Sequence, residues 1–514
     1  MEHPIMLGFI ALPLLFPTSL AVAISDPVHE NKQGLSSAHR HVEALILGGG
    51  VAGVIAARTF HEEGIDDFLI VEARNELGGR LKSATFGGKT IELGANWIQG
   101  TQTGNGPENP ILTLAKKHNL RTQYNDLFGS LTTYDNNGAV NYLDVVDTSI
   151  DAFVNHTIYS GTRLTQNLVD LSSRSAYDLI GVKPRDIHAK AAEYFNVDFE
   201  YAQKPDQNSA IAGSWNNNFT YDIDQGGFSE ENLLSIDQRG FKAFIQEEAN
   251  TFLKPRQLRL KSTVKSISWS DSGVRVVLKD GTTISANYAL CTFSLGVLQN
   301  DDVLFIPKLP GMFIDFLAYY KLEAIASMTM ATYTKIFLKF PKKFWFDTEM
   351  ALYADPERGH YPVWQSLDHK HFLPGSGLIF VTVTGDYSKR IEALPDSQVK
   401  AEVLNVLQSM FPNITVPPPL DFYFPRWTSD PLYRGSYSNW PPSFVQQHHV
   451  NLRSNVDRLY FAGEATSMKY YGFLHGAYFE GLDVAQSIIK CITHQSCVRV
   501  EHFDKAQNGI PYDI

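Results

Sequence analysis

The most regular hydrophobic pattern lies near the N-terminal end of the chain, in residues 42–47 (Val-Glu-Ala-Leu-Ile-Leu), and predicts a buried strand. A glycine-rich turn follows at 48–53, and residues 54–63 then have the pattern of a helix. A second apolar run, 67–71, ends in Glu72. The order strand, glycine-rich turn, helix and strand predicts a βαβ unit that binds a dinucleotide.

The glycines of this turn have distinct physical roles. Gly48 permits the tight turn, Gly50 lets the backbone approach a pyrophosphate, and Gly53 lets the helix pack closely on the strand. The N-terminus of the helix would face the phosphates with its partial positive charge. Glu72 has the spacing expected for a carboxylate that binds a ribose. A βαβ turn without a ligand is the alternative interpretation.

Further along the chain, residues 331–340 alternate with period two. This pattern predicts a strand with Tyr333, Lys335 and Phe337 on one face, which in isolation would be an ordinary solvated face. A short apolar run at 458–461 predicts another buried strand. The segment 472–481 that follows opens a helix with small residues on one side.

Composition limits the class of protein. A chain of 514 residues is long enough for two domains, and 44% hydrophobic with 19% charged residues is typical of a globular protein. A formal net charge of -11 without a basic run argues against nucleic acid as a partner. An acidic enzyme would instead attract cationic amines.

The first residues predict a route through the secretory pathway. An apolar stretch from 5 to 23 ends in Ala21-Val22-Ala23, so we expect residues 1–23 to be a signal peptide and the mature protein to be secreted, without a membrane span. A vacuolar destination stays open. Three glycosylation sequons, at Asn155, Asn218 and Asn413, fit this route.

Three cysteines are too few for a disulfide scaffold. Cys491 and Cys497 are close enough in sequence to close a small loop, and Cys291 is expected to be a buried thiol. No spacing of cysteine and histidine indicates a metal, so we predict no metal site.

Several separated segments resemble the flavin amine oxidase superfamily, and within it the secreted polyamine oxidases. Residues 72–80 (Glu-Ala-Arg-Asn-Glu-Leu-Gly-Gly-Arg) resemble its second signature, and the resemblance continues through 92–97, 258–278 and 458–481. It implies an FAD-dependent oxidoreductase that oxidises a C–N bond of a small amine by hydride transfer to the flavin. Dioxygen would take the electrons as hydrogen peroxide, leaving an imine or aldehyde.

The resemblance also implies an α/β fold, in which a Rossmann-like FAD-binding domain of the GR2 type carries an inserted α+β substrate-binding domain. The FAD-binding domain would comprise residues 42–125, 237–305 and 421–490. The substrate-binding domain would comprise 126–236 and 306–420, and residues 491–514 would form a C-terminal tail.

The family motifs, matched residue by residue, imply the site residues. The segment 468–471 has no cysteine where monoamine oxidases carry one, so the FAD is expected to bind non-covalently. Lys335 is the expected catalytic residue, holding a water near the flavin, and Tyr333, Tyr437 and Phe473 are expected to contact the substrate. The expected cofactor-binding residues are Gly48, Gly50, Gly53, Glu72, Arg80, Gly94, Ala95, Asn96, Trp97, Val264, Trp427 and Glu464.

The chain departs from the family at two substrate positions. Gln99 and Gln203 align with the carboxylates that recognise a polycation in plant polyamine oxidases, so an acetylated polyamine, a monoamine or an amine of specialised metabolism is an alternative substrate. Neighbouring carboxylates could restore an acidic mouth: Asp198, Glu200, Asp206, Asp222 and Asp224.

Two other functions are weighed against this one. An L-amino acid or aryl monoamine oxidase would need an arginine for a substrate carboxylate. Only Arg434 lies near a member of the expected aromatic pair, Tyr437 and Phe473, in the sequence. A flavin-binding protein without catalysis would fit the two glutamines but not the retained Lys335.

Overall fold

The computed structural model describes residues 40–166, 168–310, 320–494 and 497. The expected signal peptide at 1–23 and most of the expected tail at 491–514 lie outside the described residues.

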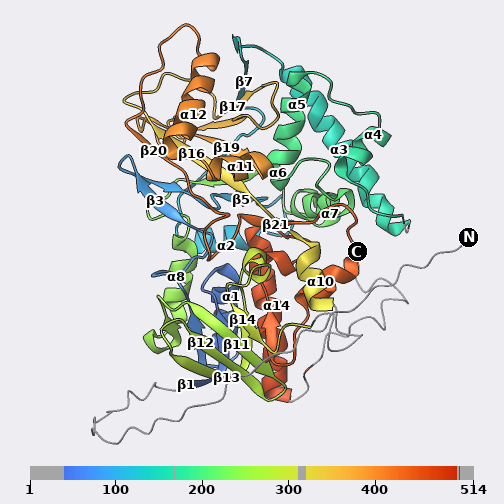
Figure 1. Cartoon of the computed structure of the whole chain (residues 1–514), viewed down its shortest axis with the longest axis vertical. Coiled ribbons are helices and arrows are strands. Elements are labelled where there is room, and N and C mark those ends of the chain that lie inside the picture. The colour runs from blue at the N-terminus through green and yellow to red at the C-terminus, as the bar shows by residue number, and fades with distance from the viewer. Residues whose placement is uncertain (1–39, 167, 311–319, 495–496, 498–514) are drawn as a thin grey trace, which may run out of the picture. The chain divides into compact units, whose positions relative to one another are not determined.

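An eight-stranded sheet forms the predicted nucleotide-binding unit (Figure 1). Its central strand β1 (Arg40–Leu47) pairs in parallel with β2 (Phe68–Val71) on one side and β13 (Thr283–Cys291) on the other. The remaining strands are β10 (Leu258–Arg259), β11 (Val264–Ser270), β12 (Gly273–Leu278), β14 (Leu304–Ile306) and β22 (Leu459–Phe461). Parallel strands joined through helices confirm the predicted Rossmann-like α/β fold.

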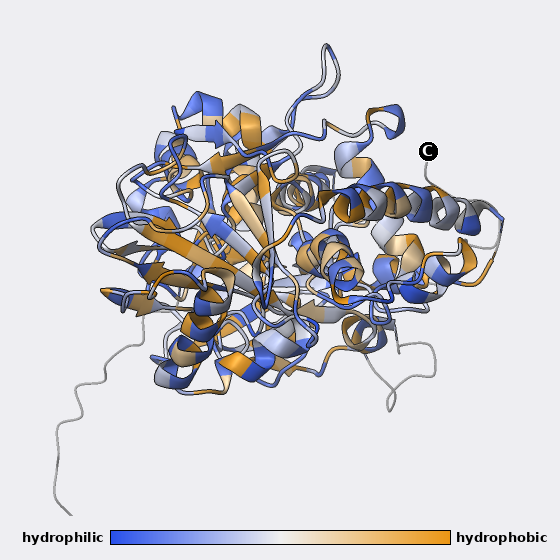
Figure 2. Cartoon of the chain, turned by 90° about the horizontal axis from the view of Figure 1, so that it is seen from above, coloured by the Kyte–Doolittle hydropathy of each residue, from blue (hydrophilic) through white to orange (hydrophobic). Residues whose placement is uncertain are grey.

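Helices pack on this sheet through small and apolar residues. The helix α1 (Val51–Glu62) contacts α14 (Leu474–His494), and a Cβ at Gly481 would collide with the backbone of Ala52. The same hydrophobic core contains residues of α2 (Pro110–Lys117) and α8 (Ala243–Phe252). In Figure 2 hydrophobic residues are concentrated in the strands, whereas the helices carry both kinds. Close packing therefore brings the N-terminal and C-terminal segments together.

A second sheet of seven strands is formed mainly by the inserted segments. In order across the sheet its strands are β20 (Asp421–Tyr423), β16 (Tyr333–Lys339), β19 (Leu378–Thr384), β18 (Val363–Ser366), β17 (Met350–Tyr353), β7 (Leu131–Asp135) and β8 (Gly138–Ala139). Ile336 and Leu338 share a core with α12 (Asp396–Met410), whereas Phe337 belongs to a different one. This alternation agrees with the predicted period of two along β16.

Helices from 143 to 221 accompany this sheet, in agreement with an α+β domain (Figure 1). They are α3 (Leu143–Thr165), α4 (Ser173–Leu179), α5 (Ile187–Glu193), the π-helical turn η1 (Tyr194–Asp198), α6 (Phe199–Tyr201) and α7 (Ala210–Tyr221). The helix α11 (Gly385–Glu392) follows β19.

Smaller elements connect the two sheets. The short strands are β3 (Ser83–Phe86) with β4 (Lys89–Glu92), β5 (Trp97–Gln99) and β6 (Thr122–Tyr124) with β9 (Asn232–Ser235), and β15 (Thr329–Ala331) with β21 (Tyr437–Asn439). The remaining helices are α9 (Leu295–Leu298), α10 (Tyr320–Ser327) and α13 (Gln446–Arg453), with the 3₁₀ turns η2 (Ile223–Gln225), η3 (Pro255–Gln257) and η4 (Glu464–Thr466).

Two boundaries differ from those expected. The strand β20 pairs with β16, so residues 421–423 belong to the second sheet, although they were expected in the segment 421–490 of the FAD-binding domain. The strand β14 pairs with β11, so residue 306 still belongs to the first sheet.

The cysteines and the helices bear on two further expectations. Cys491 and Cys497 are free thiols, and Cys291 is a buried free thiol, as expected. Among the described residues no helix is long and apolar enough to cross a membrane.

Candidate active site

One large cavity of about 910 Å³ collects residues from both sheets and from the small strands between them. Sixteen of the predicted site residues line it: Gly48, Gly50, Glu72, Arg80, Gly94, Ala95, Asn96, Trp97, Gln99, Val264, Tyr333, Lys335, Trp427, Tyr437, Glu464 and Phe473. Gly53 and Gln203 do not line it.

The glycine-rich turn makes one end of the cavity. At Gly50 an added Cβ would meet only the Cα atom of Gly79, at 3.9 Å, so a side chain there would project into the open space. At Gly53 a Cβ would collide with the carbonyl oxygen of Gly48, which is the close helix–strand approach expected at this position. The backbone at Gly50 is therefore exposed to whatever fills the cavity.

Glu72 stands at the end of β2 with its carboxylate fixed. One oxygen accepts a hydrogen bond from the amide of Gly49 at 2.7 Å, and the other accepts one from the amide of Arg74 at 2.7 Å. Each carboxylate oxygen can accept a second hydrogen bond, so ribose hydroxyl groups would find oriented acceptors.

Arg80 and Glu464 form an ion pair at the cavity that joins an N-terminal segment of the chain to a C-terminal one. The Arg80 guanidinium donates to a Glu464 oxygen at 2.6 Å and to the carbonyl of Ser436 at 3.1 Å. The other Glu464 oxygen accepts from the Ser438 hydroxyl at 2.5 Å and from the Gly472 amide at 2.8 Å. Further donors of Arg80 can face the cavity, as a phosphate contact requires.

Lys335 projects from β16 toward the residues that follow the end of β4. Its ammonium donates to the Gly94 carbonyl at 2.6 Å and to the Asn96 side-chain oxygen at 2.5 Å, and its Nζ lies 5.2 Å from the centre of the Trp97 ring. Burial lowers the pKa of Lys335 to about 7, although the nearby carboxylate of Glu92 opposes this change. Near pH 7 this amine can both hold and release a proton.

Aromatic side chains form the walls beside Lys335. The Tyr333 ring lies 6.0 Å from that of Tyr437 and 5.7 Å from that of Phe199, measured between ring centres. Phe473 lies 6.2 Å from Tyr221 at an interplanar angle of 85°. Flat apolar walls of this kind suit a carbon chain and stabilise a passing cation.

Glu200 is a partly buried carboxylate that the family motifs do not single out. It lines the cavity at the last turn of the α5–η1–α6 helix, and no described residue forms an ion pair with it. Burial raises its pKa to about 7. Its charge acts on the hydroxyl groups of Tyr221, Tyr333 and Tyr437, which raises their pKa values further. The cavity thus contains a carboxylate with which no described residue forms an ion pair.

The helix that carries Glu200 is held by buried ion pairs. Arg358 donates to both oxygens of Asp198, at 3.0 and 2.5 Å, and lies 2.9 Å from a Glu193 oxygen. Arg174 donates to the other Glu193 oxygen at 2.8 Å. The carboxylate of Asp198 therefore holds this helix through an ion pair, and Asp198 does not line the cavity.

The structure corrects the placement of Gln203. Its side-chain oxygen accepts a hydrogen bond at 2.6 Å from Asn439, which lines the cavity, so Gln203 lies one layer behind the lining. The reason is that Ala202, with a φ of 52°, ends the helix and turns the chain away. Gln99 does line the cavity, where its amide bonds with the hydroxyl of Tyr221.

The outer part of the cavity is acidic, through residues other than those expected. Asp126, Glu230 and Glu231 line it, whereas Asp206, Asp222 and Asp224 do not. No local pattern marks Asp126, Glu230 and Glu231, because they lie on loops that only the three-stranded sheet β5–β9–β6 brings together.

The lining fits a bound dinucleotide. The exposed backbone at Gly50, the oriented carboxylate of Glu72 and the guanidinium of Arg80 line one cavity and supply the groups that ribose and phosphates bind. The cavity also extends to Lys335 and Glu200, which leaves room for a second molecule.

This combination of nucleotide-binding fold and buried amine-binding chemistry defines a class of oxidoreductase. The chain matches the family model "Flavin containing amine oxidoreductase" over residues 51–489 and belongs to that family. It is thus a flavin-dependent amine oxidoreductase.

Among its relatives are plant polyamine oxidases. The chain is 34% identical to polyamine oxidase 1 of Zea mays, with 94% of this chain and 97% of that protein covered. It is also 34% identical to polyamine oxidase 6 of Oryza sativa subsp. japonica, with 94% and 98% covered. A wild-type putrescine oxidase solved with putrescine has a TM-score of 0.69 at 16% identity, covering 88% of this chain and 99% of that one, and shares the fold.

Proposed function

We propose that this enzyme oxidises an amine that carries a second, cationic nitrogen some distance from the reacting one. The observation that carries the proposal is Glu200, a carboxylate inside the cavity without a positive partner among the described residues. Burying an unpaired charge is costly, and a ligand cation that pairs with Glu200 removes that cost.

Lys335 supports the oxidation through its proton. A bound flavin, held at Gly50, Glu72 and Arg80, would accept the two electrons removed from the amine, and dioxygen would take these electrons with two protons to give hydrogen peroxide. Lys335 Nζ is held by the Gly94 carbonyl and the Asn96 side chain, and its pKa of about 7 lets it move a proton to or from a water beside it. The amine must lose its own proton before its α-carbon is oxidised, so a nearby proton acceptor favours reaction.

The walls orient the substrate. Tyr333, Tyr437 and Phe473 exclude water from the carbon chain and leave Glu200 as the anchor for the distal nitrogen. The acidic residues of the outer cavity, Asp126 and Glu230, would attract a di- or polycation toward the entrance. Together these features favour a diamine or polyamine, free or acetylated at one end.

A monoamine is the second candidate, and Gln99 favours it. A neutral amide at this position offers hydrogen bonds but no charge to a cation. The deciding experiment measures hydrogen peroxide release from spermine, spermidine, their acetyl derivatives and simple monoamines. We expect the parent protein to prefer amines with two or more nitrogens and the Glu200→Gln variant to lose this preference. Equal rates for monoamines and diamines in the parent protein, or an unchanged preference in Glu200→Gln, would contradict the proposal.

We propose further that the FAD binds non-covalently. None of Cys291, Cys491 and Cys497 lines the cavity, so no cysteine is placed for a thioether link to the flavin. Denaturation in acid should release all yellow colour into the supernatant. Colour that stays with the precipitated protein would contradict this.

We also propose that the protein is secreted and glycosylated. Asn155 and Asn413 are exposed, which supports their use as acceptors. Protein from the culture medium should begin after residue 23 and lose mass on treatment with an endoglycosidase. Retention of residues 1–23 would contradict the proposal.

A further inference from the structure

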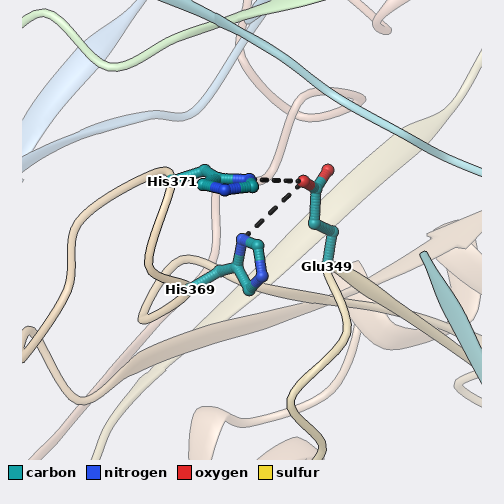
Figure 3. A group of neighbouring side chains, drawn as sticks. All are labelled: Glu349, His369 and His371. Atoms are coloured by element: carbon teal, nitrogen blue, oxygen red, sulfur yellow. Dashed lines mark hydrogen bonds and ion pairs between the residues drawn. The ribbon is translucent and has the colours of Figure 1, made fainter.

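A glutamate and two histidines converge outside the active cavity (Figure 3). Glu349 directly precedes β17, and His369 and His371 lie on the connection between β18 and β19. A Glu349 oxygen lies 3.4 Å from Nδ1 of His371 and 3.7 Å from Nδ1 of His369. All three possible ligand atoms lie within 4.8 Å of one another.

These separations suit one small cation. Nitrogen and oxygen ligands about 2.0–2.1 Å from a tetrahedral zinc ion lie about 3.4 Å from each other. The two distances from Glu349 are close to this value, so small side-chain rotations would complete the geometry. Two imidazoles with one carboxylate are a donor set for a zinc-class ion, whereas calcium and magnesium prefer oxygen ligands only.

His369 supplies the independent observation. Its side chain is 7% exposed, and its Nδ1 atom has no hydrogen-bond partner among the described residues. Figure 3 shows this nitrogen turned toward Glu349. A buried polar atom without a partner is unfavourable, and a bound cation would satisfy it.

The surroundings have the organisation of a metal site. The second oxygen of Glu349 accepts hydrogen bonds from the Asn125 side chain and the Asp126 amide, both at 2.8 Å, which orient the first oxygen toward the histidines. His371 is exposed, which leaves access for the ion and for a water as fourth ligand.

We propose that Glu349, His369 and His371 bind one divalent transition-metal ion of the zinc class, with water in the fourth position. The sequence predicted no such site, because Glu349 lies twenty residues before His369 and no cysteine accompanies the pair. The ion has a structural role in the cavity wall. Asn125 accepts a hydrogen bond from the Trp97 indole at 2.7 Å, and Trp97 lines the cavity beside Lys335.

The experiment uses FAD-loaded protein without a polyhistidine tag, treated with a chelator and then titrated with zinc sulfate in a calorimeter. One ion should bind per chain, and zinc should raise the midpoint of thermal unfolding. His371→Ala, at an exposed position, should weaken binding at least about tenfold and abolish the rise. Glu349→Gln should behave in the same way.

His61→Ala is the matched control. His61 lies 2.9 Å from a carboxylate oxygen of Asp66 but belongs to no group of three ligands among the described residues. Its variant should bind zinc as the parent protein does. No saturable binding to the parent, or equal affinity in His371→Ala, would overturn the proposal. Since the measurement is of metal binding, its result is independent of the substrate.

Discussion

Two buried lysines, Lys335 and Lys321, both donate to carbonyl oxygens but lie in different parts of the molecule. Lys321 in α10 donates to the carbonyls of Leu452 and Ser454, at 2.7 and 2.5 Å, at the C-terminal end of α13. Its Nζ lies 3.8 Å from the centre of the Phe461 ring. Burial lowers the pKa of Lys321 well below its ordinary value, as it lowers that of Lys335.

The difference lies in the space around each amine. Lys321 is enclosed and satisfies the last carbonyls of a helix, which is a structural role. Lys335 lines a cavity of about 910 Å³ that also contains Glu200 and the aromatic walls. A lowered pKa therefore does not identify a catalytic lysine by itself; access to a ligand does.

The largest expected effect is on the rates of flavin reduction and reoxidation, which should differ between variants of the two lysines. Lys335→Met should slow flavin reduction or reoxidation about 10²- to 10⁴-fold, because a positioned proton donor and acceptor is lost. The variant should keep its yellow absorption band. Stopped-flow absorbance measures both half-reactions, and Lys321→Met serves as the control with unchanged rates. Unaltered rates for Lys335→Met in both half-reactions would remove its assignment.

The second effect separates them by stability. Lys321→Met leaves the C-terminal carbonyls of α13 without donors and should lower the free energy of unfolding by about 2–3 kcal/mol. The midpoint of thermal unfolding measures the loss. An unchanged midpoint, or a fall in kcat without a fall in stability, would show that Lys321 is not the structural member of the pair.

A third, smaller effect concerns Glu200, the carboxylate that lines the cavity together with Lys335. Glu200→Gln should raise KM about 10- to 100-fold for a diamine, since a charge-assisted hydrogen bond is lost, and leave a monoamine nearly unaffected. Glu230→Gln, at the exposed rim, is the control and should have a weak, salt-dependent effect. Equal losses for diamine and monoamine would contradict the anchor.

The smallest effect is on the pH profile. If the neutral amine of Lys335 accepts the proton, flavin reduction at saturating substrate should rise about tenfold between pH 6 and 8, around its pKa of about 7. Glu200 also ionises near pH 7, so Glu200→Gln must keep the inflection and Lys335→Met must lose it. The opposite pattern would assign the titration to Glu200.

The same pKa has a consequence for stability. Folding lowers the pKa of Lys335 from its ordinary 10.5 to about 7, so the unfolded chain binds more protons between these values. Stability therefore rises with pH through this window as far as Lys335 contributes, and below pH 7 its full cost is present. Lys335→Met should flatten this part of the stability curve.

Local spacing explains what the sequence predicted well. The glycine-rich turn and Glu72 follow from the geometry of a βαβ unit, and the period of two along β16 placed Tyr333 and Lys335 on the cavity side. These features depend on residues close together in the chain.

Other features depend on changes of helical phase or on distant contacts. The π-helical turn at 194–198 inserts an extra residue into the turn, so the side chain that faces the cavity could not be read from α-helical spacing. For this reason Glu200 was only one of several candidates, and Gln203 was misplaced. The Glu349 group depends on strand pairing across the second sheet, which no local pattern encodes.

The ion pair between Arg80 and Glu464 spans 384 positions of the chain. During synthesis the glycine-rich turn is thus made long before the residues that complete its pocket. A nascent chain that ends before residue 464 lacks the wall opposite Arg80, so the complete flavin pocket exists only after nearly the whole polypeptide has been translated. We therefore expect tight cofactor binding to report complete assembly of the molecule.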